Sequence, residues 1–201
     1  MRFIAKLFLI LIVCAALVWL GGVLKDKNVL QDSIIRFHVV ANSDSEADQS
    51  NKLAVRDAVV KYLQDKMEQL PTVEDARKYI TENLGKIEQI AKDTLQRLGA
   101  DNAVKVSIDL EEFGTRVYDT FTLPAGVYEA LKIEIGEAMG KNWWCVVFPS
   151  FCMPKTTAQF ESAAVSSGFE QRVTNTISNS SGYKVRFFVL DLFGKLENLF
   201  S

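Results

Sequence analysis

An uncharged, mostly apolar run of 18 residues, Leu7–Leu24, separates the N-terminus from the rest of the chain. Two basic residues, Arg2 and Lys6, precede this run, and the charged residues 25–27 end it. A basic start followed by an apolar run is typical of a secretory signal peptide, and a run of this length is also near the shortest that spans a bilayer as a helix. We therefore expect residues 1–27 to be a signal peptide or a membrane anchor, and the remainder to fold outside the cytosol.

The composition excludes several classes of function. The net charge is −2, and nucleic-acid binders usually carry a basic excess, so we expect no nucleic-acid partner. His38 is the only histidine, which excludes metal sites that need several imidazoles. No glycine-rich phosphate-binding motif is present in the sequence, and we therefore expect neither a metal nor a cofactor.

Export changes how the cysteines are interpreted. Cys14 lies in the leader, which leaves Cys145 and Cys152 for the folded domain. An even pair in an exported chain predicts a disulfide, and closing so short a loop would stabilise the fold by about 2–3 kcal/mol. The alternative is a pair of free, buried thiols, which would suit a reducing compartment.

The first half of the domain has the pattern of one strand followed by two amphipathic helices. β-Branched and aromatic residues over Ile34–Val40 predict a strand, and the polar residues 42–45 that follow are typical of a turn and a helix cap. Apolar residues then recur at steps of three and four over 53–70 and 73–98, with Pro71 between the two runs. We expect an αα-hairpin packed on a sheet.

The polar turn also resembles the start of a calcium-binding loop, because Asn42, Asp44, Glu46 and Asp48 alternate along it. The sixth position of such a loop requires glycine and the twelfth requires glutamate. This sequence has Ala47 and Leu53 there, so helix capping is the better interpretation.

The second half of the domain changes from helical to alternating periodicity. Strand-like runs separated by turn residues cover 104–110, 115–123, 131–135 and 142–148. Consecutive strands joined by short turns predict an antiparallel, mostly meander sheet.

The last fifty residues differ in composition from the rest. Residues 153–182 are rich in Ser and Thr, which predicts a surface excursion or partly ordered linker, with a short helix around Gln159–Val165 as an alternative. Residues 183–201 return to strand character. The predicted fold class is therefore α+β: an N-terminal signal or anchor helix, an α+β core over 28–152, the excursion, and a returning C-terminal strand that completes the domain.

Two tryptophans stand side by side in the last predicted strand of the core. Successive strand residues point to opposite faces, so only one of Trp143 and Trp144 can pack into a one-sided core. The other is a candidate contact for a partner, since aromatic side chains bury large areas at interfaces. The alternative is that both pack internally, one of them under the Ser/Thr-rich segment.

The sequence offers one way to build a nucleophilic enzyme. A catalytic cysteine needs a base within hydrogen-bonding reach, and His38 is the only histidine that could serve Cys145 or Cys152. However, His38 alternates with Phe37 and Val39 in the predicted strand, which is typical of a structural or surface histidine. No G-x-S-x-G motif is present in the sequence.

Three long stretches carry a family resemblance. "IIRFHVVANSDSEADQSNKLAVRDAVV", "LPAGVYEALKIEIGEAMGKNWWCVVFPSFC" and "VRFFVLDLF" resemble the stage II sporulation protein R family, over nearly all of 34–152 and the last predicted strand. The chain departs from the family pattern at 113–119, where "FGTRVYD" stands for the usual "FPTK.YG". It also has a shorter linker before the last strand.

The resemblance implies a function. Members of this family are made in the forespore and exported into the space between forespore and mother cell. There they activate a membrane-embedded aspartic protease of the mother cell, which then processes the sigma-E precursor. On this basis we expect an intercellular signal rather than an enzyme. The alternatives are an exported Cys–His hydrolase acting on wall or peptide substrates, and a membrane-anchored structural protein of the same space.

The family supplies no catalytic residues to carry over, so the site residues are hypotheses drawn from the sequence. The candidates lie near the cysteine loop and at the corner between the first strand and the first helix. They are Trp143, Trp144, Phe148 and Phe151 at the loop, and Arg36, Asn42, Asp44 and Arg56 at the corner. Helix capping and surface exposure also account for the corner residues.

Overall fold

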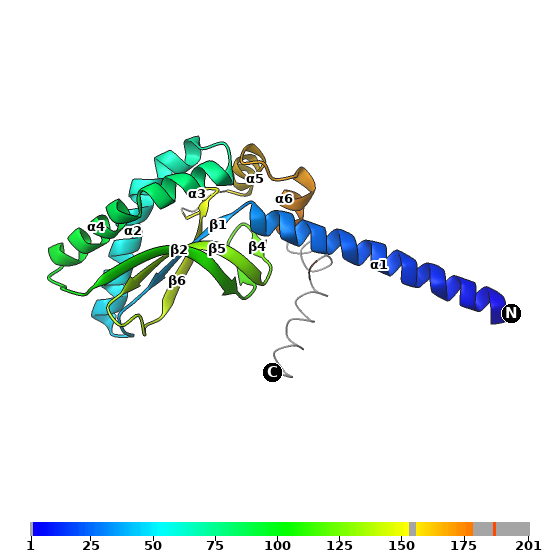
Figure 1. Cartoon of the computed structure of the whole chain (residues 1–201), viewed down its shortest axis with the longest axis horizontal. Helices are drawn as coiled ribbons and strands as arrows, with labels where there is room; N and C mark the ends of the chain where they lie inside the picture. Colours follow the sequence, from blue (N-terminus) through cyan, green and yellow to red (C-terminus); the bar gives the residue numbers. More distant parts are fainter. Residues whose placement is uncertain (1, 153–155, 179–186, 188–201) are drawn as a thin grey trace.

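The computed structural model of the chain describes residues 2–152, 156–178 and 187 (Figure 1). It has the α+β class expected from the sequence. The elements, in chain order, are α1 (Arg2–Asp32), β1 (Ile35–Val40), α2 (Glu46–Gln69), α3 (Val73–Glu82), α4 (Leu84–Arg97), β2 (Val104–Phe113), β3 (Arg116–Val117), β4 (Thr122–Leu123), β5 (Gly126–Ile135), β6 (Asn142–Phe148), α5 (Thr157–Ser166) and α6 (Gln171–Ser178).

The main sheet is mixed, and the expected meander is wrong. Its strand order is β2-β5-β1-β6, with β1 parallel to β5 and antiparallel to β6, while β2 and β5 are antiparallel. Every residue of β1 is buried, including Arg36 and His38. A strand buried on both faces belongs in the interior of a sheet, so β1 separates the consecutive strands β5 and β6.

The connection from β5 to β6 therefore crosses the C-terminal end of β1 at close range. A Cβ atom on Gly136 would lie 2.1 Å from Asn42 Oδ1, and one on Gly140 would lie 2.2 Å from the Ser43 carbonyl oxygen. Asn42 Oδ1 accepts a hydrogen bond from the Glu137 backbone N–H at 3.0 Å. The absence of side chains at these two glycines is what allows the crossing.

Helices α2, α3 and α4 cover one face of the sheet. Their buried apolar residues and the odd-numbered residues of β1 and β5 form the larger core. Ser45 and Thr72 cap α2 and α3 by accepting from the backbone N–H groups of Asp48 and Asp75, as the capping interpretation predicts. The second predicted helix is divided at Asn83 into α3 and α4.

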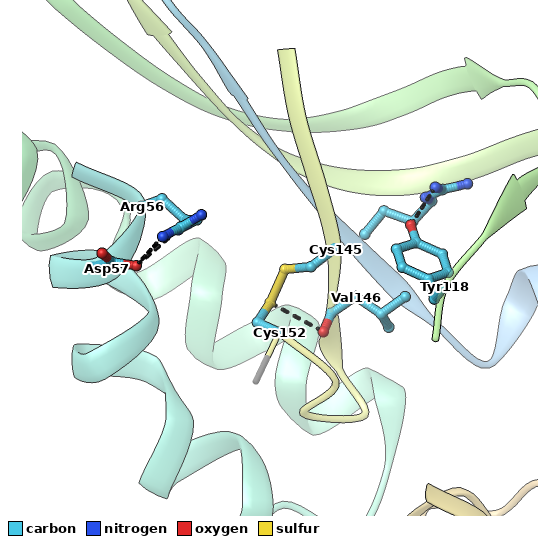
Figure 2. The surroundings of a disulfide bond; sticks show 7 residues. Arg56, Asp57, Tyr118, Cys145, Val146 and Cys152 are labelled. Atoms are coloured by element: carbon cyan, nitrogen blue, oxygen red, sulfur yellow. Dashed lines mark hydrogen bonds and ion pairs between the residues drawn. A yellow bond between two sulfur atoms is a disulfide. The ribbon is translucent and has the colours of Figure 1, made fainter. Parts of the chain in front are cut away.

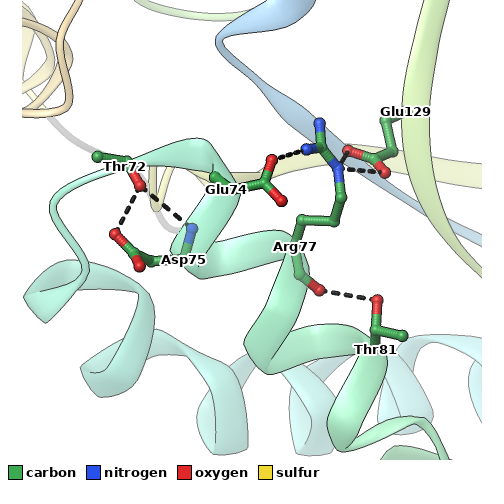
Figure 3. A network of polar contacts seen from close by, with 6 residues as sticks. All are labelled: Thr72, Glu74, Asp75, Arg77, Thr81 and Glu129. Atoms are coloured by element: carbon green, nitrogen blue, oxygen red, sulfur yellow. Dashed lines mark hydrogen bonds and ion pairs between the residues drawn. The ribbon is translucent and has the colours of Figure 1, made fainter.

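A charged contact ties α3 to the sheet (Figure 3). Arg77 Nε donates to both carboxylate oxygens of Glu129 on β5 at 2.8 Å, and Nη1 contacts Glu74 in its own helix. The hydrogen bonds that Arg77 donates to Glu129 outweigh its partial burial and raise the pKa of Arg77. This pair orients the helical layer relative to the strand that it covers.

The other face of the sheet carries a second, smaller core at one end. The end of α1, the β3–β4 hairpin, α5 and α6 supply its buried apolar side chains. The large aromatic members are Phe113, Phe121, Tyr128, Phe151, Phe160, Phe169 and Phe187.

The segment 153–182, expected as an excursion or linker, is packed structure where it is described. Phe160 on α5, Val173 and Ile177 on α6, and Phe169 between the two helices are buried in the second core. The two helices are short, and Ser and Thr separate their apolar residues. The prediction therefore followed the Ser/Thr-rich composition rather than the helical spacing. The predicted C-terminal strand, 183–201, lies outside the described residues except for Phe187, which is buried.

Helix α1 has two parts with different surroundings. Its segment Phe3–Asp32 is long and apolar enough to cross a membrane, and Figure 1 shows the helix extending away from the domain. In contrast, Val23 and Leu30, near its C-terminal end, are fully buried in the second core. Gln31 Nε2 also donates to the Val127 carbonyl on β5 at 2.7 Å. The helix is therefore compatible with a signal or an anchor, but its last turns belong to the folded domain.

Candidate functional site

A cavity of about 310 Å³ lies along the edge strand β6. It is bounded by β6, by the turn between β3 and β4, and by the loop and helix that follow β6. Its lining residues are Val117, Tyr118, Asp119, Thr120, Phe121, Trp143, Trp144, Cys145, Phe151, Cys152 and Phe160. Five of the residues proposed from the sequence, the two tryptophans, the two cysteines and Phe151, thus share one pocket.

A disulfide shapes one wall of this pocket. Cys145 on β6 is bonded to Cys152 in the loop that follows, which is the pairing expected from the sequence (Figure 2). The loop contains a cis Phe148–Pro149 peptide bond and returns so that the Phe151 N–H donates to the Val146 carbonyl at 3.0 Å. Cys152 Sγ lies 3.2 Å from the same oxygen, which is a contact only, since a disulfide sulfur has no proton to donate.

The two tryptophans point to opposite faces of the sheet, as the strand period requires. Trp143 lies on the helical side, edge-on to Phe37 at 6.2 Å, with the Arg56 guanidinium 4.7 Å from its ring centre. Trp144 lies on the other side and stacks on His38 at 3.8 Å. Both are half-buried, so each packs internally and still presents part of its surface to the pocket.

The far wall of the pocket is an aromatic cluster. Tyr118 stacks on Phe121 with ring centres 4.6 Å apart, and Phe121 stacks on Phe160 at 4.6 Å. Phe151 lies 4.6 Å from Phe160 and 5.5 Å from Phe121. The sequence analysis missed Tyr118, Phe121 and Phe160. Tyr118 and Phe121 could have been found from the two aromatic residues in one short predicted strand run. Phe160 falls in the short helix allowed around Gln159–Val165, but nothing in the sequence placed that helix beside the cysteine loop.

Arg36 lies behind this wall and is completely buried. Its Nη2 donates to the Tyr118 hydroxyl at 2.8 Å, and its guanidinium lies 3.9 Å from the centre of the Phe113 ring. Burial lowers the pKa of Arg36, although an arginine retains its charge in proteins. The Nε and Nη1 groups have no hydrogen-bond partner in the part of the chain that the structure describes.

His38 belongs to a charged network on the open part of the same sheet face. Its Nδ1 lies 3.0 Å from Glu111 Oε2, and Lys132 Nζ lies 3.1 Å from Glu111 Oε1. Burial lowers the pKa of His38, which makes it a neutral imidazole whose Nδ1–H donates to Glu111. Burial opposes ionisation of Glu111, but hydrogen bonds from His38 and Lys132 outweigh it and lower its pKa.

The Cys–His arrangement required by the hydrolase alternative is not formed. Cys145 and Cys152 are bonded to each other, and Cys145 belongs to the core under the helices. His38 stacks with Trp144 on the opposite face. Within the described ranges, no group of three His, Cys, Asp or Glu side chains could hold a metal ion.

The other proposed residues lie apart from the pocket. Asp44 Oδ1 accepts from the Lys141 N–H at 2.7 Å, and Asn42 Nδ2 donates to Asp48 at 2.9 Å, so both hold the corner under the β5–β6 crossing. Arg56 pairs with Asp57 at 2.7 Å and covers Trp143. Phe148 is fully buried in the larger core.

Comparisons with known proteins identify the family. The model of the family described as stage II sporulation protein R matches residues 31–158. The chain belongs to this family. It is 41% identical over 124 residues to the stage II sporulation protein R of Bacillus subtilis (strain 168), a match that covers 62% of this chain and 55% of that relative. The matched region thus spans little more than half the length of the curated relative. No solved structure matches the chain.

Family membership assigns the chain a role in sporulation. The family match includes Arg36, Tyr118, Trp144 and Phe151, which build most of the pocket and its rear wall. Of the lining residues, only Phe160 lies outside the matched region, just beyond its end.

Proposed function

We propose that this chain is an exported signalling protein of endospore formation. It leaves the forespore, acts in the space between forespore and mother cell, and activates a membrane-embedded aspartic protease that processes the sigma-E precursor. Membership of the stage II sporulation protein R family, over the residues that build the pocket, is the observation that carries this proposal.

The arrangement of the molecule supports a binding role for the domain. The apolar N-terminal half of α1 is exposed and long enough to enter a membrane, whereas the end of α1 packs against the domain. The disulfide suits an oxidising space outside the cytosol. An aromatic pocket at a sheet edge offers a protein partner both apolar surface and backbone hydrogen-bonding groups.

Activation by a ligand requires a difference in affinity between two states of the receptor. A signal that bound the inactive and the active protease equally well would not shift the equilibrium between them. The proposed signal must therefore bind a surface that exists, or is better formed, in the active protease. Assembly of two protease halves into one aspartic dyad is a state change that such binding could stabilise.

The test is processing of the sigma-E precursor in a non-sporulating host that expresses the protease. Processing is measured by immunoblot with and without this chain, and with His38→Ala, Cys145→Ala, Trp143→Ala and Trp144→Ala. Leu110→Ala is the matched control, because Leu110 is 74% exposed on β2, the opposite edge strand of the sheet. Near-ultraviolet circular dichroism establishes that each variant is folded.

We expect processing to require the chain, to survive His38→Ala and Leu110→Ala, and to fall with folded Trp144→Ala. If precursor processing proceeds equally without the chain, the signalling function is wrong for this protein. Loss of processing with folded His38→Ala would instead point to chemistry at the His38–Glu111 network.

A further inference from the structure

Three hydrogen-bond donors meet behind and beside the pocket without an acceptor. Among the described residues, Arg36 donates through Nη2 to Tyr118, while its buried Nε and Nη1 groups have no partner. The Tyr118 oxygen accepts that bond, so its own proton is left to be donated, and the described residues offer it no acceptor. Unpaired donors in a low-dielectric interior are costly, and the uncompensated positive charge of Arg36 favours an anion in the pocket, where the Tyr118 hydroxyl can donate to it.

A second guanidinium increases the positive potential at the same place. Arg116, on β3, is exposed and lies 5.0 Å from the centre of the Trp144 ring. Arg116 is close enough to Arg36 to lower its pKa by repulsion, a smaller effect than burial. In the part of the chain that the structure describes, neither arginine has a carboxylate within ion-pair distance. The nearest acidic lining residue, Asp119, is exposed and pairs with neither.

The edge of β6 supplies backbone groups next to these donors. The Val146 carbonyl faces away from β1, since it accepts from Phe151 in the disulfide loop. Alternate residues of a strand direct their N–H and C=O groups to the same side, so the backbone of Trp144 also faces outward. The disulfide loop ends the free edge at Val146, and the open part of the edge runs from Asn142 to Trp144 beside the cavity.

We propose that this pocket binds an extended segment of the partner through an internal acidic side chain. The segment would pair with β6 at Asn142–Trp144, and its carboxylate would accept from Tyr118 and Arg116, with Arg36 behind Tyr118 strengthening the field. An aromatic or apolar neighbour in the segment would contact the exposed part of Trp144 and the wall formed by Phe121 and Phe151. The proposal deepens the proposed function, on which it rests, by naming the chemistry of the docking segment.

An internal acidic residue fits better than a chain terminus. The edge of β6 is open on the Asn142 side of the cavity, so a strand added there continues beyond the donors on that side and does not have to end at them. Ion pairs of carboxylates with arginine, reinforced by a tyrosine hydroxyl, are charge-assisted hydrogen bonds and are among the stronger polar contacts.

The test uses three small blocked peptides and the full-length chain in detergent micelles. Ac-Phe-Glu-NHMe carries a side-chain carboxylate, Ac-Phe-Gln-NHMe is its uncharged isostere, and Ac-Gln-Phe-OH carries only a terminal carboxylate. Binding is followed by NMR through the indole N–H signals of Trp143 and Trp144. The variants are Arg116→Met and Tyr118→Phe, with Arg97→Met, an exposed arginine on α4, as the matched control.

We expect the Glu peptide to bind about tenfold more tightly than the Gln peptide, an advantage that Arg116→Met and Tyr118→Phe reduce and Arg97→Met leaves unchanged. Equal binding of the Glu and Gln peptides, no binding of either, or an advantage that survives both variants would overturn the proposal. Preferential binding of Ac-Gln-Phe-OH would overturn the choice of an internal residue. The assay contains no protease, so its failure is separate from failure of precursor processing.

Discussion

Arg36 donates to the hydroxyl of Tyr118 across 2.8 Å, and among the described residues this is the only hydrogen bond of the buried guanidinium. Phe113 and Tyr128 cover the cation at 3.9 Å and 5.2 Å from their ring centres. Ring contacts offset part of the desolvation of a cation, but they do not replace a carboxylate. The Arg36–Tyr118 pair therefore costs stability in the free domain, which is the expected property of a group retained for binding.

Replacement of Arg36 by methionine tests this trade-off. We expect Arg36→Met to leave the free energy of unfolding unchanged or to raise it by about 1–3 kcal/mol, because an unpaired buried charge is replaced by an apolar side chain. The same variant should lose activity in the processing assay. Chemical denaturation measures the first effect. A loss of more than about 2 kcal/mol, as is typical when a buried, well-paired group is removed, would show that Arg36 is structural.

Removal of the disulfide should loosen one wall of the pocket. The double variant Cys145→Ser/Cys152→Ser is expected to lose about 2–3 kcal/mol of unfolding free energy, because a short loop is no longer closed in the unfolded chain. Precursor processing should fall by more than the loss of folded protein accounts for, because the same loop positions Phe151 in the pocket.

Cys14→Ser is the matched control for the disulfide, because Cys14 is free and exposed in α1. Thermal unfolding with and without a reducing agent provides an independent measurement on the unmodified chain. An equal response of the double variant and of wild type to the reducing agent would contradict the prediction.

Features that depend on residues close in sequence were predicted correctly, whereas features that depend on long-range contacts were not. Capping at Ser45 and Thr72, the helical pattern of α2 and the Cys145–Cys152 pairing depend on residues close in sequence, and the sequence predicted them. The position of β1 between β5 and β6 depends on long-range pairing, which periodicity does not contain.

The candidate site shows the same division. The tryptophans and Phe151 were found because they adjoin the cysteines in the sequence. Tyr118, Phe121 and Phe160 reach the pocket from a hairpin and a helix elsewhere in the chain. Arg36 was proposed as a corner residue, but its side chain lies in the second core, on the face opposite α2.

Stability should depend on pH through His38. Burial lowers the pKa of His38 in the folded chain below the ordinary value of 6.5, so the unfolded state binds the proton first as the pH falls. The free energy of unfolding should then decrease from about pH 6.5 downward, until the folded imidazole is also protonated. Glu111, Lys132 and Asn142 are the polar groups that face His38, and Glu111 opposes the shift.

The measurement is chemical denaturation of wild type and His38→Gln at pH 7.5 and pH 5.5. We expect wild type to lose more stability than the variant between these values, because glutamine does not titrate. Glu111 titrates below this window in the folded chain, since its pKa is lowered. Equal losses in the two proteins would contradict the neutral, buried state of His38.

The end of α1 should contribute to the stability of the domain whatever happens to its apolar start. Leu30 is fully buried, whereas Leu17, in the same helix, is 62% exposed. Leu30→Ala is therefore expected to cost about 2–5 kcal/mol of unfolding free energy in micelles, and Leu17→Ala should cost little. Similarly, a chain shortened to begin at residue 20 should keep its melting temperature, while one that begins at residue 33 should melt lower.

The burial of the last turns of α1 limits where the leader can be cleaved. A signal peptidase that cut after residue 27 would remove Val23, which is fully buried against the domain, together with the buried Asp26. We therefore expect the mature protein either to retain α1 as an anchor or to begin before Val23, as a cut at Gly21–Gly22 would give. Mass spectrometry of the protein isolated from sporulating cells determines the N-terminus. A start at residue 28 or later, with the melting temperature of the full chain, would show that α1 is not part of the domain.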